Sequence, residues 1–561
     1  MESWGRHSRP KPGTAGVTGY SQVMIPNPVA ALGRLIDEST SAQGRGKRAY
    51  GFYWTRKSSE LARELIAFFT RPGSVILDPF LGSGTTGLGC VSAEGRRLFV
   101  GVEINELPIQ SLLATLVPDL VMDRTDFQKA KSALDEVLSL YRFEMSEGIV
   151  ELEKIIHNQT DAGLVPTEFI VRESNGAQNS FTESKTPKQF AELLGLYNLR
   201  TSNFLKRDAS ALATNSRIAV KPGMLVSDVF GPMGFEALCR FKEIGKDSMV
   251  FRLILAGSVH LTRLTDAKSQ SQFPFWFPKQ DIHEKSAYGV LSKRLGELGD
   301  LLNSLEFAEP KVIETFSQWD KSQNSSVRLI HGSTITDLKE MEDESVDFIL
   351  TDPPYFDQVA YSEYLKLWEY FTDFSADLDR EIVESSRVDA GKTRGKFLED
   401  LKSAFIEVRR VTKTGSFALV YFKDSKPKNL HDFITILGFA GFSYLGQKHL
   451  AKASFTYKQN ATTETTVGGD SLMIFVATDD SFVEPSSTKS LEELDGEFLS
   501  RFSDYVRDNG PSSLTEALDN ALIASMYRTG YLAKISNSRH LVEVVSLKFR
   551  FEPSSRKWYP R

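Results

Sequence analysis

The chain has 561 residues, of which 41% are hydrophobic and 25% are charged, and its formal net charge is −6. This composition is that of a globular protein with two or more domains, and the chain contains no run of roughly 18 apolar residues, the length that a transmembrane helix requires. Two cysteines, Cys90 and Cys239, exclude a disulfide framework and favour a cytoplasmic location. The negative charge argues against a nucleic-acid partner for the chain as a whole, but residues 171–300 carry an excess of about five positive charges.

Residues 1–16 are polar and lack the apolar core of a secretory signal, so we expect a leader without fixed structure. The first strong helix signal comes later, where Ser58 or Ser59 is a candidate N-cap. Apolar residues at positions 61, 65, 66 and 69 then fall on one helical face.

A strand, a glycine turn, a helix and a second strand follow one another next. The apolar run Val75–Leu77 predicts a buried strand, and Gly82 and Gly84 allow a tight turn. A helix is expected from Thr85. This arrangement is typical of sites that hold a nucleotide-like cofactor against a helix N-terminus. An acid that ends the second strand, here Glu103, is suited to hydrogen-bond ribose hydroxyls.

The glycines alone leave an alternative open. Gly82, Gly84 and Gly87 also satisfy the dinucleotide fingerprint G-x-G-x-x-G, so a plain Rossmann oxidoreductase stays formally possible. No G-K-[ST] follows, which excludes a kinase-type P-loop. The sequence Asp78-Pro79-Phe80 before the turn is not part of the dinucleotide fingerprint.

The sequence Asp352-Pro353-Pro354-Tyr355 follows a second buried strand, expected over 345–350, which the prolines end. It brings an acid, a fixed carbonyl and an aromatic ring to the end of a strand, where ligands bind in open α/β sheets. An exocyclic aromatic amine is a poor nucleophile because its lone pair is delocalised into the ring. The Asp352 carboxylate and the Pro353 carbonyl are suited to accept its two N–H groups, and Tyr355 is suited to stack on a flat base. The alternative is a proline-rich turn with a capping Asp and a packing Tyr.

Together, Leu77–Thr86 (LDPFLGSGTT) and Asp352–Tyr355 resemble the amino-group DNA methyltransferases, S-adenosylmethionine enzymes that methylate adenine N6 or cytosine N4. Tyr53–Ser58 resembles the segment that precedes the cofactor loop in that family and helps to bind the methionine end of the cofactor. Tyr355–Leu365 resembles a subset of adenine-specific methylases. The likeness covers less than half of the chain.

This resemblance implies three sets of site residues. The catalytic candidates are Asp352, Pro353, Pro354 and Tyr355. The cofactor, S-adenosyl-L-methionine, is expected at Thr55, Lys57, Asp78, Pro79, Phe80, Gly82, Ser83, Gly84, Thr85, Glu103 and Ser333. The target base is expected at Tyr355, Phe356 and Tyr361. No metal site is expected, since His157, His260 and His283 have no partner at metal-ligand spacing.

The two motifs stand about 270 residues apart, with the cofactor loop first, which departs from the commonest order of this form and leaves room for an inserted domain. We expect a mainly helical target-recognition insert over 121–325, with helices over 127–150, 188–206 and 248–265 and a loop over 171–187. The aromatic cluster Gln272–Lys279 is a candidate for stacking on nucleic acid, or for packing within the insert.

After the insert, strands and helices alternate again, which predicts a Rossmann-like α/β sheet with helices on both faces. Helices are expected over 361–371, 397–411 and 430–441, and strands over 326–333, 415–422, 442–449 and 471–477, the last two antiparallel. The loop 458–470 is a candidate for DNA contact. The predicted domains are a leader (1–49), a first methyltransferase half (50–120), the insert (121–325), a second half (326–480) and a helical, basic C-terminal extension (481–561).

These features predict a DNA methyltransferase that takes a flipped base. Adenine N6 is preferred because an Asp in the first position of the D-P-P-Y motif, here Asp352, resembles the adenine enzymes more often than the cytosine ones. Three alternatives stay open: cytosine N4 methylation, RNA guanine-N2 methylation (whose enzymes share this motif order), and a catalytically inactive cofactor-binding subunit. Cytosine C5 methylation is disfavoured, since neither cysteine follows a proline. The expected partner is DNA, with a restriction or defence-system subunit as a further option and no membrane.

Overall fold

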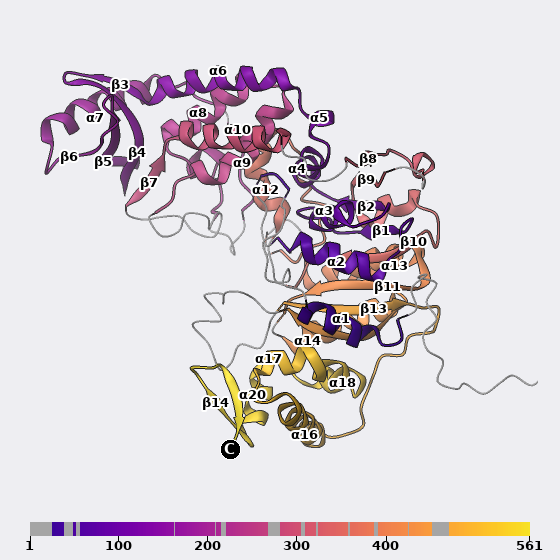
Figure 1. Cartoon of the computed structure of the whole chain (residues 1–561). Coiled ribbons are helices and arrows are strands. Elements are labelled where there is room, and N and C mark those ends of the chain that lie inside the picture. Colours follow the sequence, from indigo (N-terminus) through magenta and orange to yellow (C-terminus); the bar gives the residue numbers. More distant parts are fainter. Residues whose placement is uncertain are drawn as a thin grey trace, which may run out of the picture.

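Figure 1 shows a computed structural model of the chain, with a central sheet between an inserted lobe and a C-terminal lobe. The structure describes residues 25–38, 49–51, 56–161, 163–207, 209–214, 220–266, 281–303, 309–320, 324–356, 360–385, 387, 391–424, 426–450 and 470–561. The predicted Gln272–Lys279 cluster, the body of the 458–470 loop and the 1–16 leader lie outside these residues.

Eight strands form the central sheet in the order β12-β13-β11-β10-β1-β2-β9-β8. Neighbouring strands are parallel, except that β13 runs antiparallel to both β11 and β12. The predicted antiparallel final pair is therefore confirmed, and the sheet is compatible with a Rossmann-like methyltransferase. Its strands are β1 (Val75–Asp78), β2 (Leu98–Glu103), β8 (Lys311–Val312), β9 (Ser326–His331), β10 (Val346–Thr351), β11 (Thr412–Phe422), β12 (Phe442–Leu450) and β13 (Asp470–Ala477).

Helices cover both faces of the sheet. Successive side chains of a buried strand point to opposite sides, so both faces of the sheet are apolar and each is covered by helices. On β1, Ile76 packs into one core cluster, and Val75 and Leu77 pack into the other. The Ile76 face carries α1 (Pro28–Glu38), α2 (Ser59–Phe69), α3 (Thr85–Ser92) and α4 (Glu106–Leu116). The opposite face carries α11 (Thr334–Asp337), η4 (Leu338–Glu340), α13 (Arg394–Val411) and α14 (Pro427–Phe439). The short turn η3 (Phe316–Gln318) follows β8.

The segment between β2 and β9 contains a sheet as well as helices, so the prediction of a mainly helical insert is not confirmed. An antiparallel sheet in the order β3-β4-β5-β6, with β7 paired to β4, lies beside its helices (Figure 1). The helix expected over 127–150 ends at Tyr141, and the loop expected over 171–187 contains β6. The hairpins turn at Gly148, Gly163 and Gly176, whose φ angles of 130°, 113° and 86° favour glycine.

The helices expected over 188–206 and 248–265 are confirmed as α7 and α9. In chain order the elements of this lobe are α5 (Pro118–Val121), α6 (Arg124–Tyr141), β3 (Arg142–Met145), β4 (Gly148–Thr160), β5 (Gly163–Glu173), β6 (Gln178–Thr182), α7 (Pro187–Ser202), η2 (Val226–Val229), α8 (Pro232–Ile244), α9 (Met249–Thr262), β7 (Ile282–Lys285) and α10 (Ala287–Asn303).

One helix from beyond the insert joins the insert's core. Helix α12 (Tyr361–Thr372) packs on α9, and the Trp368 indole N–H donates to the Ala256 carbonyl at 2.9 Å. Helix α12 follows the Asp352–Tyr355 motif in the chain, so its packing in the core of the insert connects the insert to the segment that carries this motif.

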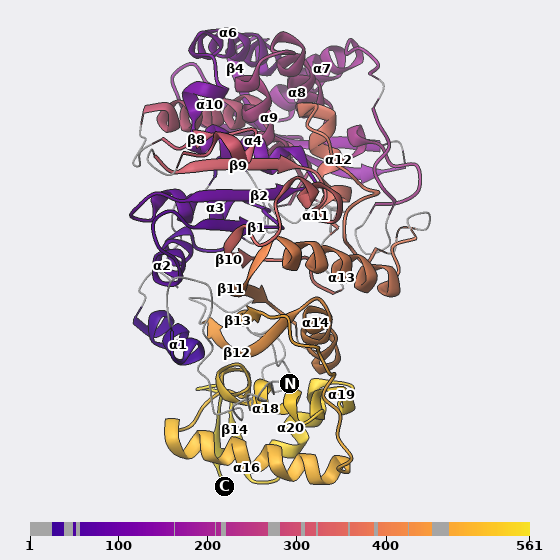
Figure 2. The same ribbon diagram turned by 90° about the vertical axis from the view of Figure 1, so that its right-hand side faces the viewer.

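The last lobe packs under β12 and α14 and shares their hydrophobic core (Figure 2). Its elements are α16 (Leu491–Asn509), α17 (Leu514–Ala517), η5 (Leu518–Leu522), α18 (Ile523–Arg528), α19 (Tyr531–Lys534), α20 (Ser538–Ser546), β14 (Phe549–Glu552) and β15 (Lys557–Pro560). Among the described residues, no helix has the length and apolar character to cross a membrane.

Candidate active site

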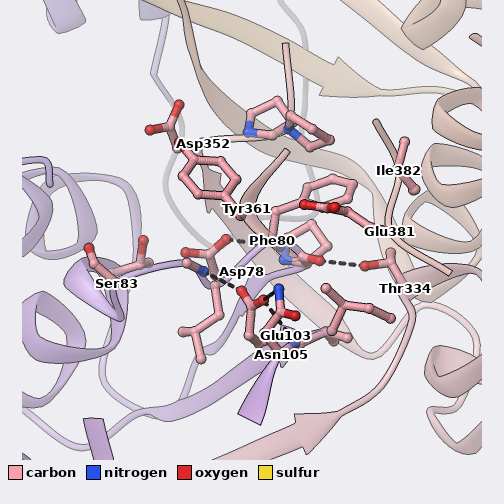
Figure 3. Close-up of a pocket in the computed structure, with 18 of the residues that line it drawn as sticks. Asp78, Phe80, Ser83, Glu103, Asn105, Thr334, Asp352, Tyr361, Glu381 and Ile382 are labelled. Carbon is pink, nitrogen blue, oxygen red and sulfur yellow. Dashed lines mark hydrogen bonds between the residues drawn. The ribbon is translucent and has the colours of Figure 1, made fainter. Parts of the chain in front are cut away.

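A pocket opens where β1, β2, β9, β10 and β11 end, and Figure 3 shows side chains from both halves of the chain converging on it. It is lined by Lys57, Ala62, Asp78, Pro79, Phe80, Leu81, Gly82, Ser83, Thr85, Thr86, Val102, Glu103, Ile104, Asn105, Gly332, Ser333, Thr334, Asp352, Pro353, Pro354, Tyr355, Tyr361, Arg380, Glu381, Ile382, Val383 and Tyr421. The two predicted motifs therefore face one common space.

Asp78, at the end of β1, joins the two motifs. Its Oδ1 accepts a hydrogen bond from the Thr351 hydroxyl at 2.7 Å and another from the Phe80 N–H at 3.2 Å. Thr351 is the residue immediately before Asp352, so this contact sets the two strand ends against each other. Burial raises the pKa of Asp78 to about 6, although the hydrogen bonds oppose the shift.

The glycine turn after Asp78 has the backbone that the sequence predicts. Gly82 and Gly84 have φ angles of 50° and 75°. A Cβ atom at Gly84 would lie 2.9 Å from the Leu112 side chain, so this position has no room for a larger residue. Gly84 supports the turn from behind and is not itself part of the pocket lining.

Glu103, at the end of β2, holds that turn in place. Its Oε2 accepts from the Gly82 N–H at 2.8 Å, and its Oε1 accepts from the Asn105 backbone N–H at 3.1 Å and side-chain amide at 3.3 Å. Burial raises the pKa of Glu103 to about 7. The acid is thus buried beside the glycine turn, with Asn105 as a partner that the sequence analysis did not identify.

Asp352 is surrounded by polar groups from three parts of the chain. Its Oδ2 lies 3.1 Å from the Lys57 ammonium, and its Oδ1 neighbours the Tyr355 hydroxyl. That hydroxyl also lies 2.9 Å from the Tyr421 carbonyl, so its single proton serves two acceptors. The Lys57 ammonium also lies over the Tyr421 ring, 5.2 Å from its centre.

Burial and charge oppose each other in the Lys57–Asp352 pair. Burial raises the pKa of Asp352, and the neighbouring Lys57 ammonium partly offsets that rise. For Lys57, burial alone would lower the pKa, but the carboxylates of Asp352 and Asp470 outweigh it and raise the pKa. Each member of the pair therefore favours the charged form of the other.

Most of the predicted site residues line the pocket, and three do not. Thr55 lies outside the described residues. Gly84 stands behind the turn, as above. Phe356 was expected to contact the target base, but it is 2% exposed and packs against Phe397, with ring centres 5.2 Å apart. The Arg394 guanidinium covers its ring at 4.7 Å, so the structure directs Phe356 into the core and away from the pocket.

Two predicted residues lie where the loops after β9 and before α12 meet the pocket. Ser333 caps α11, its hydroxyl accepting from the Ile335 N–H at 3.3 Å, and it still lines the pocket. Tyr361 lines the pocket at the start of α12.

Sequence reasoning missed Thr334, Tyr421 and the segment Arg380–Val383. The Thr334 hydroxyl donates to the Pro79 carbonyl, which connects the loop after β9 to the segment that leads into the glycine turn. Arg380–Val383 enters the pocket from the connection between α12 and α13, a polar stretch without a motif. Tyr421 lay within a predicted strand, but its facing toward Asp352 depends on sheet register.

Comparison with known proteins gives matches over short parts of the chain. Residues 28–112 match the family model described as DNA methylase. A Type II methyltransferase, M.XycI of Xanthomonas campestris pv. cyanopsidis, is 46% identical over 55 residues, which are 10% of this chain and 18% of that protein. The DNA adenine methyltransferase YhdJ of Escherichia coli (strain K12) is 45% identical over 51 residues, 9% of this chain and 17% of that protein. The chain thus matches less than a fifth of the length of these relatives.

The matched stretch includes β1, the glycine turn and Glu103, which contribute to one side of the pocket. Over residues 28–112, the chain is therefore similar to the DNA methylases.

Proposed function

We propose that this protein transfers a methyl group from S-adenosyl-L-methionine to an exocyclic amino group of a DNA base, with adenine N6 as the target. The observation that carries the proposal is the common pocket, in which the Asp78–Thr85 loop and the Asp352–Tyr355 motif face each other. The match of residues 28–112 to DNA methylases supports the same activity.

The residues of the cofactor side fit a nucleoside with a charged tail. Gly82 has no side chain and a left-handed backbone, so a ligand can approach the turn closely. The buried Glu103 carboxyl is placed to accept hydrogen bonds from ribose hydroxyls, as the acid at this position does in nucleotide-binding sheets. When bound, S-adenosylmethionine supplies a methyl group on a sulfonium that is already activated for transfer.

Lys57 was expected to bind the methionine end of the cofactor, but its ammonium faces Asp352. We assign it to the Asp352 carboxylate as a counter-ion that keeps this group ionised and oriented. The assignment rests on the 3.1 Å separation and on the burial of both side chains, which are 17% and 27% exposed.

On the substrate side, the Asp352 carboxylate and the Pro353 carbonyl accept the two N–H groups of the target amine. Both acceptors concentrate electron density on the amine nitrogen, which makes it a better nucleophile as its geometry changes toward tetrahedral. Tyr355 presents its ring to the pocket and is fixed at its hydroxyl by the Tyr421 carbonyl, 2.9 Å away, so it is held ready to stack on a base. The proton that the methylated amine loses would pass along its hydrogen bond to the Asp352 carboxylate, and no covalent link to the protein is needed.

Two observations favour adenine over cytosine. The first residue of the Asp352–Tyr355 motif is Asp, as in the adenine-specific enzymes that this segment resembles. One matching relative is a DNA adenine methyltransferase. The insert, whose core includes α12, is our candidate for target recognition, and the five predicted domains stay part of this proposal.

Radiolabelled methyl transfer tests the proposal. The purified protein is incubated with methyl-labelled S-adenosylmethionine and with DNA or RNA, and the nucleosides are separated after digestion. Label in N6-methyladenine from DNA is the expected result, and label in RNA alone would contradict it. Asp352→Ala is expected to lower the rate on the order of 10²–10³-fold, as loss of one transition-state contact does, while S-adenosylhomocysteine still binds.

A further inference from the structure

The connection between α12 and α13 forms part of the wall of the pocket. We name residues 373–385 the strap. Four consecutive residues of it, Arg380 to Val383, line the pocket, and Figure 3 shows Glu381 and Ile382 beside Thr334, across the pocket from Asp352. The strap therefore lies on the side of the pocket near Glu103 and Asn105.

Hydrogen bonds at both ends fix the strap. The Ser375 N–H donates to the Glu106 carboxylate at 3.1 Å, and the Asp377 N–H donates to the Asn105 side-chain oxygen at 3.2 Å. At the other end the buried Lys392 ammonium donates to the backbone carbonyls of Asp379 and Glu381, the latter at 2.8 Å. The strap is therefore a rigid wall whose side chains have defined directions.

Glu381 is the most unusual side chain of this wall. It is 7% exposed, and its Oε1 accepts from the Ser362 N–H at 3.2 Å. Its Oε2 has no hydrogen-bond partner among the residues that the structure describes. A buried polar atom without a partner is costly, and at the wall of a binding pocket a ligand is the natural partner.

The surroundings of Glu381 favour its neutral form. Burial raises the pKa of Glu381 to about 8, and the nearby carboxylates of Glu363 on α12 and Glu103 on β2 add to the rise. Tyr364 on α12 and the Lys392 ammonium behind the strap are the other titratable groups near it. At neutral pH the side chain is then a carboxylic acid, which offers one O–H donor beside one C=O acceptor.

We propose that the free side of the Glu381 carboxyl hydrogen-bonds the adenine ring of the methyl donor. The edge of adenine presents an amino N–H donor next to a ring-nitrogen acceptor, which is complementary to a carboxylic acid. Glu381 lies near Glu103, the residue that we assign to the adjoining ribose, so adenine recognition is the contact that its position allows. The inference rests on the proposed function and makes Glu381 a specificity-determining residue for the cofactor.

Calorimetric titration of the full chain tests this assignment. The probes are S-adenosylhomocysteine and its analogue in which purine, without the 6-amino group, replaces adenine. Wild-type protein is expected to bind the first at least about tenfold more tightly than the second, as loss of a buried hydrogen bond implies. In Glu381→Leu the two affinities are expected to become equal. Equal affinities in the wild type, or unchanged discrimination in Glu381→Leu, would overturn the proposal.

Two further variants separate recognition from folding. Glu381→Gln keeps a donor beside an acceptor, so it is expected to bind S-adenosylhomocysteine as the wild type does at pH 7 and to lose the decline in affinity that the wild type shows above about pH 8. Asp379→Asn makes the same carboxyl-to-amide change two residues earlier, where the side chain is 94% exposed, and is expected to change neither affinity. If Glu381→Gln retains the wild-type decline, the contact is contradicted even where Glu381→Leu does not fold. If the wild type binds neither probe, the proposed function fails, and the role of Glu381 fails with it.

Discussion

The Lys57 ammonium and the Asp352 carboxylate lie 3.1 Å apart, although one precedes the insert and the other follows it. The contact joins the segment before α2 to the Asp352–Tyr355 side of the pocket. The attraction within a charge pair in a partly buried site is stronger than in a surface ion pair, because solvent screens it less.

Lys57→Ala tests the counter-ion role. Burial already raises the pKa of Asp352, and without the ammonium this pKa rises further. As the pH falls, the carboxylate that we propose as acceptor of the target amine is then protonated at a higher pH than in the wild type. The acid limb of the pH profile of kcat/KM is therefore expected to move upward by about 1–3 units. Lys428→Ala, at a position that is 66% exposed, serves as the control. An acid limb that stays in place would remove Lys57 from this role.

Substitution of Glu103 tests the cofactor side. Glu103→Gln and Glu103→Ala are expected to weaken S-adenosylhomocysteine binding by about 1–3 kcal/mol, or roughly 5–150-fold, because hydrogen bonds to the ribose and to the Gly82 N–H are lost. Calorimetry measures the change. Glu94→Gln, an exposed acid after α3, is the matched control. Wild-type affinity in both Glu103 variants would contradict the assignment.

The hydrogen bond between Thr351 and Asp78 predicts a stability effect. Thr351→Val leaves the buried Asp78 carboxyl without its 2.7 Å donor, so the free energy of unfolding is expected to fall by about 1–3 kcal/mol. Urea unfolding measures this. The same change at the exposed Thr336 is expected to have little effect, and equal stability of the two variants would show that the link between the strand ends is not needed.

The insert offers a pair of cations for a DNA-binding test. Lys154 on β4 and Lys285 on β7 lie opposite each other in the antiparallel register, and burial together with the Lys154 charge lowers the pKa of Lys285. If both lysines contact phosphates, the double variant Lys154→Gln/Lys285→Gln is expected to reduce the slope of log affinity against log salt by about 2, since each phosphate contact contributes about 0.9. Lys188→Gln on α7 is the control. An unchanged slope would exclude this pair from the interface.

Much of the sheet was predictable because its signals are local. Val75–Leu77 and the strand before Asp352 are short apolar runs with turn residues behind them, and the structure has β1 and β10 there. The fold of the insert was harder to predict from the sequence. Its strands β4 and β5 alternate over part of their length between buried and more exposed side chains. The helical pattern of α6 nevertheless runs directly into β3, and the first glycine, Gly148, comes only after β3.

The residues of the pocket were also only partly predictable from the sequence. Asp78, Glu103 and Asp352 stand at strand ends, and parallel strands bring their carboxyl ends together, so their convergence followed from the fold. Glu381 and the Lys57–Asp352 contact depend on how distant loops pack, for which one sequence holds no signal. Phe356 was misplaced because a residue after a turn can face the pocket or the core, and the partners that decide this, Phe397 and Arg394, lie far along the chain.

Nucleoside mass spectrometry of genomic DNA tests the central claim most directly. The chain and its Asp352→Ala variant are each produced in a bacterial host that has no adenine methylation of its own, at matched protein levels. We predict N6-methyladenine in the DNA of cells with the wild-type chain and none above background in cells with the variant. N4-methylcytosine alone would contradict the choice of adenine, and equal methylation by the variant would contradict the role of Asp352.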